Sequence, residues 1–65
     1  MSSNDVYWED AKYGKILRTP YHKEFQARLE AEVPVDEHQW RGHGRWISDG
    51  YIREVQSLIF EFFGK

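Results

Sequence analysis

Three histidines, His22, His38 and His43, are the side chains in this sequence best suited to metal binding or proton transfer. A catalytic zinc site needs about three protein ligands that converge on one point. His38 and His43 can approach each other across a predicted hairpin, but His22 belongs to a different predicted element. Neither HExxH nor another zinc-binding spacing is present. We therefore expect no metal site and no cofactor.

Nucleophilic and acid–base catalysis lack candidate residues as well. Cysteine is absent, and no serine lies in a Gly-x-Ser-x-Gly motif. The neighbouring carboxylates Glu30 with Glu32, and Asp36 with Glu37, lie in segments that we expect to be solvated. Nothing in the pattern indicates the apolar surroundings that raise the pKa of a catalytic carboxyl group. The sequence thus predicts a binding domain and not an enzyme.

Basic and aromatic residues alternate in two segments that we predict to be hairpins. This combination suits single-stranded or branched nucleic acid, because cations contact phosphates while rings stack on unpaired bases. The candidate nucleic-acid-binding residues are Lys12, Tyr13, Lys15, Arg18, Trp40, Arg41, His43 and Arg45. Tyr13, in a predicted turn, is expected to be exposed and Trp46 to belong to the core, whereas Trp40 fits either location.

A second hypothesis is that the chain binds a protein or a second copy of itself. Residues 29–37 carry four acidic side chains and no basic one, which would suit a basic groove on a partner. Phe60 lies off the main apolar stripe of the last predicted helix, beside Phe63, and aromatic anchors often dominate interface energies. The candidate residues are Phe60, Phe63, Asp36 and Glu37. Such a module would serve as an inhibitor or adaptor of a larger host machine, including one encoded by a virus.

Length and composition restrict the fold to one small core. The chain has 65 residues, a net charge of −2 and a high aromatic content of 17%. We expect a single compact domain over residues 1–65, with residues 1–4 disordered. No segment approaches the roughly 20 apolar residues of a membrane span, and residues 1–5 do not resemble a signal peptide. The absence of cysteine permits a cytoplasmic location, which we expect.

A faint internal repeat with a spacing of 30 residues organises the chain. Gly14-Lys15-Ile16-Leu17 aligns with Gly44-Arg45-Trp46-Ile47. Each half independently predicts two short strands and a helix. The expected strands cover residues 6–8, 15–18, 38–41 and 45–47, with turns at 10–14 and 42–44. We predict an α+β fold in which two ββα units form a small antiparallel sheet, with both helices packed on one face.

Capping residues and apolar spacing predict where the helices lie. The first is expected to begin at Thr19 and Pro20, as a hydroxyl cap followed by Pro at the first helical position. It should end before Pro34, and its apolar stripe comprises Tyr21, Phe25, Leu29 and Val33. The second is expected to start at Ser48 or Asp49 and to run to about residue 63, with Gly64 as its C-terminal stop.

The order of these elements resembles the HARP-type domain. The residues that carry the resemblance are Tyr21-x3-Phe25, Val33-Pro34, Trp40 and Arg45-Trp46-Ile47, followed by a helix; it covers residues 16–63. HARP-type domains are DNA-binding accessory modules at branched or forked structures, so the resemblance implies a nucleic-acid role. The basic residues that usually follow the Pro in that family are replaced here by Val35-Asp36-Glu37. We accordingly expect a non-enzymatic nucleic-acid-binding module, with protein binding as the alternative.

Overall fold

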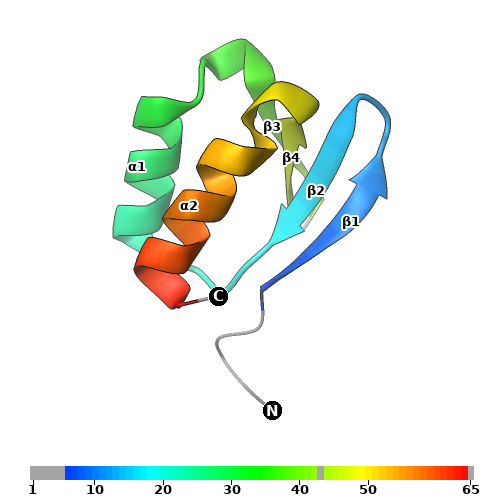
Figure 1. Cartoon of the computed structure of the whole chain (residues 1–65). Helices are drawn as coiled ribbons and strands as arrows, with labels where there is room; N and C mark the ends of the chain where they lie inside the picture. Colours follow the sequence, from blue (N-terminus) through cyan, green and yellow to red (C-terminus); the bar gives the residue numbers. More distant parts are fainter. Residues whose placement is uncertain (1–5, 43, 65) are drawn as a thin grey trace.

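The structure is a computed structural model that describes residues 6–42 and 44–64. Along the chain, the elements are β1 (Tyr7–Ala11), β2 (Gly14–Arg18), α1 (Lys23–Glu32), the 3₁₀ turn η1 (Val35–Glu37), β3 (His38–Arg41), β4 (Gly44–Ser48), the 3₁₀ turn η2 (Asp49–Tyr51) and α2 (Ile52–Phe63). The strands form an antiparallel sheet in the order β1-β2-β4-β3. Both helices cover the same face of the sheet (Figure 1). The predicted α+β fold is therefore confirmed, whereas the prediction of disorder at residues 1–4 lies outside the described residues.

The two ββα halves meet along β2 and β4 with an approximate two-fold relationship. Ile16 pairs with Trp46 across these central strands, and the same two residues are equivalent in the 30-residue repeat. Equivalent residues face each other in an antiparallel pair when a two-fold axis passes between them. Gly14 pairs with Ser48 and Leu17 with Arg45, so the hairpin turns lie at opposite ends of the sheet.

Two glycines at equivalent positions of the repeat allow β2 and β4 to approach closely. A Cβ atom on Gly14 would overlap the carbonyl oxygen of Ile47, and one on Gly44 would lie 2.5 Å from Cγ2 of Ile16. Both positions therefore require the absence of a side chain.

The core lies between the sheet and the helices. Its buried apolar residues are Leu17, Phe25, Leu29, Val33, Ile47, Val55, Leu58 and Ile59. Three of the four residues in the predicted stripe of α1 are among them, but Tyr21 is 81% exposed because it precedes the helix. The prediction that Trp46 belongs to this core is wrong. Its strand neighbours Arg45 and Ile47 face the helices, so Trp46 lies half-buried on the uncovered face of the sheet.

The structure places the start of the first helix and the first hairpin turn differently from the prediction. Residues 19–22 carry the chain from the sheet to the helix layer, so α1 begins at Lys23 and not at Thr19 or Pro20. Its cap is His22, whose Nδ1 accepts a hydrogen bond from the backbone N–H of Phe25 at 3.2 Å. The first hairpin turn is shorter than residues 10–14, since pairing continues to Ala11 and Gly14 and Tyr13 takes a positive φ of 64°.

The second helix begins after a 3₁₀ turn and ends as predicted. Ser48 precedes η2 without a side-chain cap, and α2 starts at Ile52. Gly64 ends the helix in the left-handed region with φ 71°, and its N–H donates to the carbonyl of Phe60. In the described ranges 6–42 and 44–64, no helix combines the length and apolar character needed to cross a bilayer.

Candidate binding site beside a buried arginine

Arg45 is the one buried charged residue in the described part of the chain, with 3% of its surface exposed. It lies on β4 between Leu17 of β2 and Trp40 of β3. Because strand residues alternate between the faces, Arg45 shares the helix-covered face with Ile47. The second hairpin therefore does not present this side chain to solvent, contrary to the picture of an exposed basic hairpin.

Two contacts stabilise the buried guanidinium. Its Nη2 donates a hydrogen bond to Oε2 of Glu30 on α1 at 3.2 Å, which also forms an ion pair. The Trp40 ring lies over the group, with 4.2 Å between Cζ of Arg45 and the ring centroid. A buried arginine requires such compensation because removal of a charge from water is costly. Glu30 supplies the opposite charge and Trp40 a cation–π contact.

Three polar atoms near this arginine are buried without a hydrogen-bond partner in the described residues. They are Nε and Nη1 of Arg45 and Oε1 of Gln26. Nearly all buried polar atoms in proteins are hydrogen-bonded, so each exception needs an explanation such as a water molecule, an ion or a ligand. Two donors and one acceptor in this region thus lack a hydrogen-bond partner among the described residues.

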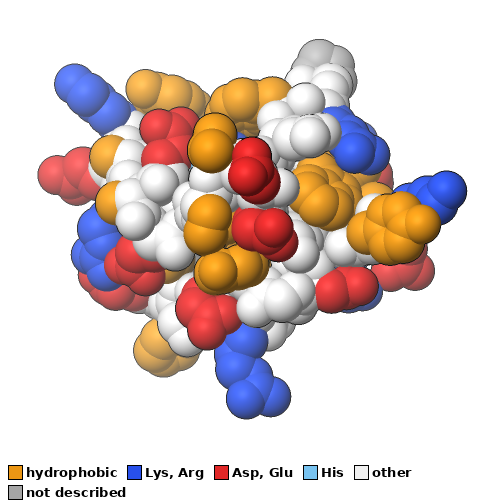
Figure 2. Space-filling model, turned by 90° about the horizontal axis from the view of Figure 1, so that it is seen from above, with side chains coloured by type: hydrophobic (Ala, Val, Ile, Leu, Met, Phe, Trp, Pro, Cys, Tyr) orange, Lys and Arg blue, Asp and Glu red, His pale blue; other side chains and the backbone are white. Residues whose placement is uncertain are grey.

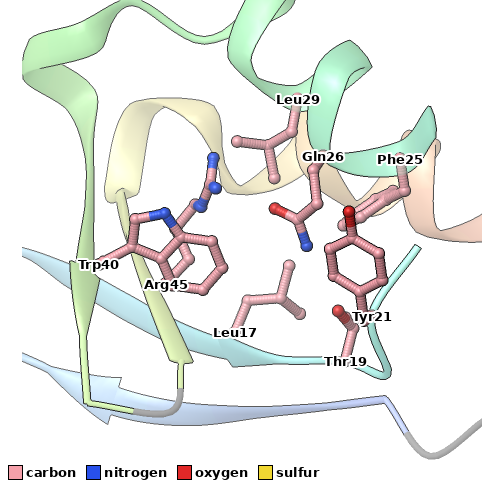
Figure 3. Close-up of a pocket in the computed structure, with 8 residues that line it drawn as sticks. All are labelled: Leu17, Thr19, Tyr21, Phe25, Gln26, Leu29, Trp40 and Arg45. Atoms are coloured by element: carbon pink, nitrogen blue, oxygen red, sulfur yellow. The ribbon is translucent and has the colours of Figure 1, made fainter. Parts of the chain in front are cut away.

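Arg45 and Gln26 both line a pocket of about 200 Å³. Its other lining residues are Leu17, Thr19, Tyr21, Phe25, Leu29 and Trp40. Trp40 and Tyr21 stand on opposite sides, with the amide of Gln26 between them (Figure 3). The pocket is smaller than the roughly 300–1,000 Å³ of sites for drug-sized ligands. It therefore suits a single flat group that offers a hydrogen-bond acceptor and a donor.

His38 belongs to the same neighbourhood. Burial lowers the pKa of its imidazole below the ordinary value of 6.5, and repulsion by Arg45 acts in the same direction, while Glu30 opposes it. The neutral imidazole is therefore favoured next to the buried guanidinium. None of the histidines, cysteines or carboxylates in the described residues gather into a group that could hold a metal ion.

The candidate nucleic-acid-binding residues fall into two separate groups. Lys12, Tyr13 and Lys15 lie around the β1–β2 turn, where Tyr13 is 74% exposed and Lys15 forms an ion pair with Asp10 at 2.9 Å. Figure 2 views the molecule from this end and shows acidic side chains across the middle of the face, with basic ones mainly at its edge. Phosphates would meet unfavourable charge there.

The second group lies at the opposite end of the sheet and consists of Arg18, Trp40, Arg41 and Arg45. Trp40 is 61% exposed. Arg41 pairs with Gly44 and its guanidinium lies over Trp46, at 5.3 Å from the ring centroid. The side chain of Arg18 lies beside Gly44. Its Nε forms an ion pair with Oε2 of Glu9 at 3.1 Å. His43 lies outside the described residues.

The candidate protein-binding residues are not brought together either. Phe60 is 71% exposed on α2, while Phe63 is half-buried, with its ring edge-on to Phe25 and His22. Asp36 and Glu37 form part of η1, which lies at the other end of the helix layer (Figure 1).

Sequence reasoning did not identify Gln26, Tyr21 and Glu30 as neighbours of Arg45. One signal was present: in β4, Arg45 and Ile47 are two residues apart, so they share a face.

Comparison of this chain with protein-family models, curated proteins and solved structures finds no match. The HARP-type resemblance stays a prediction.

Proposed function

We propose that this chain is a non-enzymatic domain that binds single-stranded or junction nucleic acid at the sheet end formed by Arg18, Trp40, Arg41 and Arg45, here named the arginine end. The observation that carries the proposal is the exposed Trp40 ring seated on the Arg45 guanidinium. One face of that ring contacts the guanidinium, and the other face is open to solvent. A base that is not paired in a duplex can stack there.

Stacking and charge act together at this end. Base–aromatic stacking contributes roughly 1–3 kcal/mol per base and tolerates any sequence. Arg41 follows Trp40 on the edge strand β3 and is exposed, but its guanidinium lies over Trp46 on the other face of the sheet, so it meets the phosphate of a strand that passes around the edge of β3. The charge of Arg45 is partly offset by Glu30, which makes Arg41 the main phosphate contact in the proposal. The HARP-type resemblance points to the same ligand class.

Fluorescence anisotropy tests this function. Labelled single-stranded, duplex and forked DNA of one sequence are titrated at two salt concentrations. The proposal expects binding that weakens with salt, because phosphate contacts release counterions, and that favours the substrates containing unpaired bases. The Trp40→Ala variant should lose affinity, whereas Tyr13→Ala, an exposed aromatic at the opposite end, should not. The proposal would be overturned if the protein bound none of the DNA substrates and no single-stranded RNA at the lower salt concentration.

Exposed Phe60 favours a second candidate function, protein binding by an inhibitor or adaptor module. A Phe that is 71% exposed beside the half-buried Phe63 is a suitable anchor for a partner or a second copy. Sedimentation of wild type and Phe60→Ala over a range of concentrations tests the self-association version. Concentration-dependent association that disappears in the variant would favour it, and a monomer at all concentrations would exclude it. For either function we propose a cytoplasmic location, since the chain needs no disulfide.

A further inference from the structure

We infer that the pocket between Trp40 and Tyr21 accepts one unpaired nucleobase, whose edge bonds to Arg45 and Gln26. The inference rests on the proposed nucleic-acid function and adds a second mode of contact to stacking on the outer side of Trp40. It assigns a ligand to three buried polar atoms that the described protein residues leave without partners.

The open hydrogen-bonding groups match the edge of a base. Nε and Nη1 of Arg45 are donors, and Oε1 of Gln26 is an acceptor. Bases present acceptors and donors side by side: guanine has O6 beside N1–H, and adenine has N7 beside the N6 amino group. A phosphate or carboxylate would satisfy only the donors of Arg45, whose charge Glu30 already offsets at 3.2 Å. A neutral, flat ligand fits the site better than a second anion.

The remaining walls suit an aromatic ring. Leu17, Phe25 and Leu29 supply an apolar lining, and the rings of Trp40 and Tyr21 stand on either side of the space (Figure 3). Tyr21 is 81% exposed and Trp40 is 61% exposed, so both rings line the mouth of the pocket. The pocket volume of about 200 Å³ limits the occupant to one base and not a whole nucleotide.

Trp40 must move outward for the base to reach the guanidinium. The two open nitrogens of Arg45 and Oε1 of Gln26 are all covered from solvent, and the Trp40 ring lies directly over the guanidinium. Trp40 belongs to β3, which is an edge strand of the sheet. Its largely exposed ring can therefore shift without disturbing the core. Entry of a base should change the environment of this indole.

Two basic residues adjoin pocket residues in the sequence but lie on the other face of the sheet. Thr19 and Trp40 line the pocket, and the basic residues Arg18 and Arg41 adjoin them in the sequence. Both arginine side chains lie on the uncovered face of the sheet, where Arg18 pairs with Glu9 and Arg41 lies over Trp46, so a strand with a base in the pocket meets them only after passing around the end of the sheet. A protein side chain such as Asn offers the same donor and acceptor, but it has no ring to lie between Trp40 and Tyr21. This difference favours the nucleobase.

The test uses NMR of the whole wild-type chain with small probes. The side-chain Nε–H of Arg45 and the amide of Gln26 are followed during titration with the four nucleoside 5′-monophosphates at millimolar concentration. Ribose 5-phosphate serves as the matched probe without a base. We expect at least one nucleotide to shift both signals while ribose 5-phosphate leaves them unchanged. The Gln26→Leu variant, which is similar in size but has no amide, should bind that nucleotide about ten-fold more weakly, as the loss of one hydrogen bond predicts.

Other results separate this inference from the proposed function. If single-stranded DNA binds at Trp40 but no nucleotide shifts Arg45 or Gln26, the pocket holds only water; the inference fails and the function stands. If N-acetyl-asparagine amide shifts both signals more strongly than any nucleotide, the pocket recognises a protein side chain and the inference is again wrong. If neither oligonucleotides nor nucleotides bind, both fail.

Discussion

The centroid of the Trp40 ring lies 4.2 Å from Cζ of Arg45, so the edge strand β3 contacts a buried charged group on the central strand β4. We expect Trp40→Ala to lower the free energy of unfolding by about 0.5–2 kcal/mol, because a partly desolvated cation loses its aromatic partner. Trp40→Phe should retain most of the stability. Urea denaturation measures both variants. Equal stability of Trp40→Ala and wild type would show that the contact contributes nothing.

Glu30 should matter more to stability than an equally exposed carboxylate with an exposed partner. Glu30→Gln removes the opposite charge from a buried arginine, and we expect a loss of about 1–3 kcal/mol. Glu30 itself is 56% exposed on its side chain, so water moderates the loss. Glu61→Gln is the matched control, because Glu61 is 55% exposed and pairs with Arg28, which lies at the surface. In thermal denaturation, Glu30→Gln should have a lower Tm than Glu61→Gln. The reverse order would contradict a role of Glu30 in stabilising Arg45.

The stability of the fold should fall with acidification through His38. Burial and Arg45 lower the pKa of this imidazole in the folded state below 6.5, so the unfolded chain binds the proton more readily. The His38 contribution is therefore complete above about pH 6.5 and is lost as the pH falls toward the folded-state pKa. Unfolding measured at about pH 7.5 and about pH 5 should show a larger loss in wild type than in His38→Asn. The charged groups that face His38, Arg45 and Glu30, are unchanged in that comparison, and parallel losses would contradict the assignment.

The approximate two-fold axis gives a paired prediction at two glycines. Gly14→Ala and Gly44→Ala should each destabilise the domain by about 1–3 kcal/mol or more, since the new Cβ meets Ile47 or Ile16 across the central strands. Gly50→Ala is the control, because its Cβ would meet nothing within 4 Å. That variant should be neutral or more stable by up to about 1 kcal/mol. Chemical denaturation of the three variants checks the pattern, and a tolerated Ala at Gly14 or Gly44 would refute the close approach.

Local signals in the sequence predicted most of the fold. Repeat spacing, turn glycines and the Phe25, Leu29 and Val33 stripe were sufficient to place the strands and helices. The start of α1 could not be predicted from Thr19 and Pro20, because the distance from the sheet to the helix layer decides where a cap can act. His22 performs that role through its ring nitrogen, which is an uncommon use of a histidine.

The candidate site was less predictable, because it depends on which face each strand residue occupies and which elements lie opposite. The sequence predicts basic residues near the hairpins but cannot show that the turns lie at opposite ends of the sheet. That separation follows from the pairing of Leu17 with Arg45, a contact between distant parts of the chain. The approach of Gln26 and Glu30 to Arg45 likewise depends on how α1 packs on the sheet.

We propose that nucleic acid binds at the arginine end and not at the β1–β2 turn. A matched pair of charge reversals tests it, Arg41→Glu at one end and Lys12→Glu at the other, both at exposed positions. Anisotropy titration of each variant with labelled single-stranded DNA at low salt is the decisive measurement. We predict that Arg41→Glu loses affinity at least about ten-fold, while Lys12→Glu stays close to wild type. Equal losses, or a greater loss for Lys12→Glu, would contradict the account.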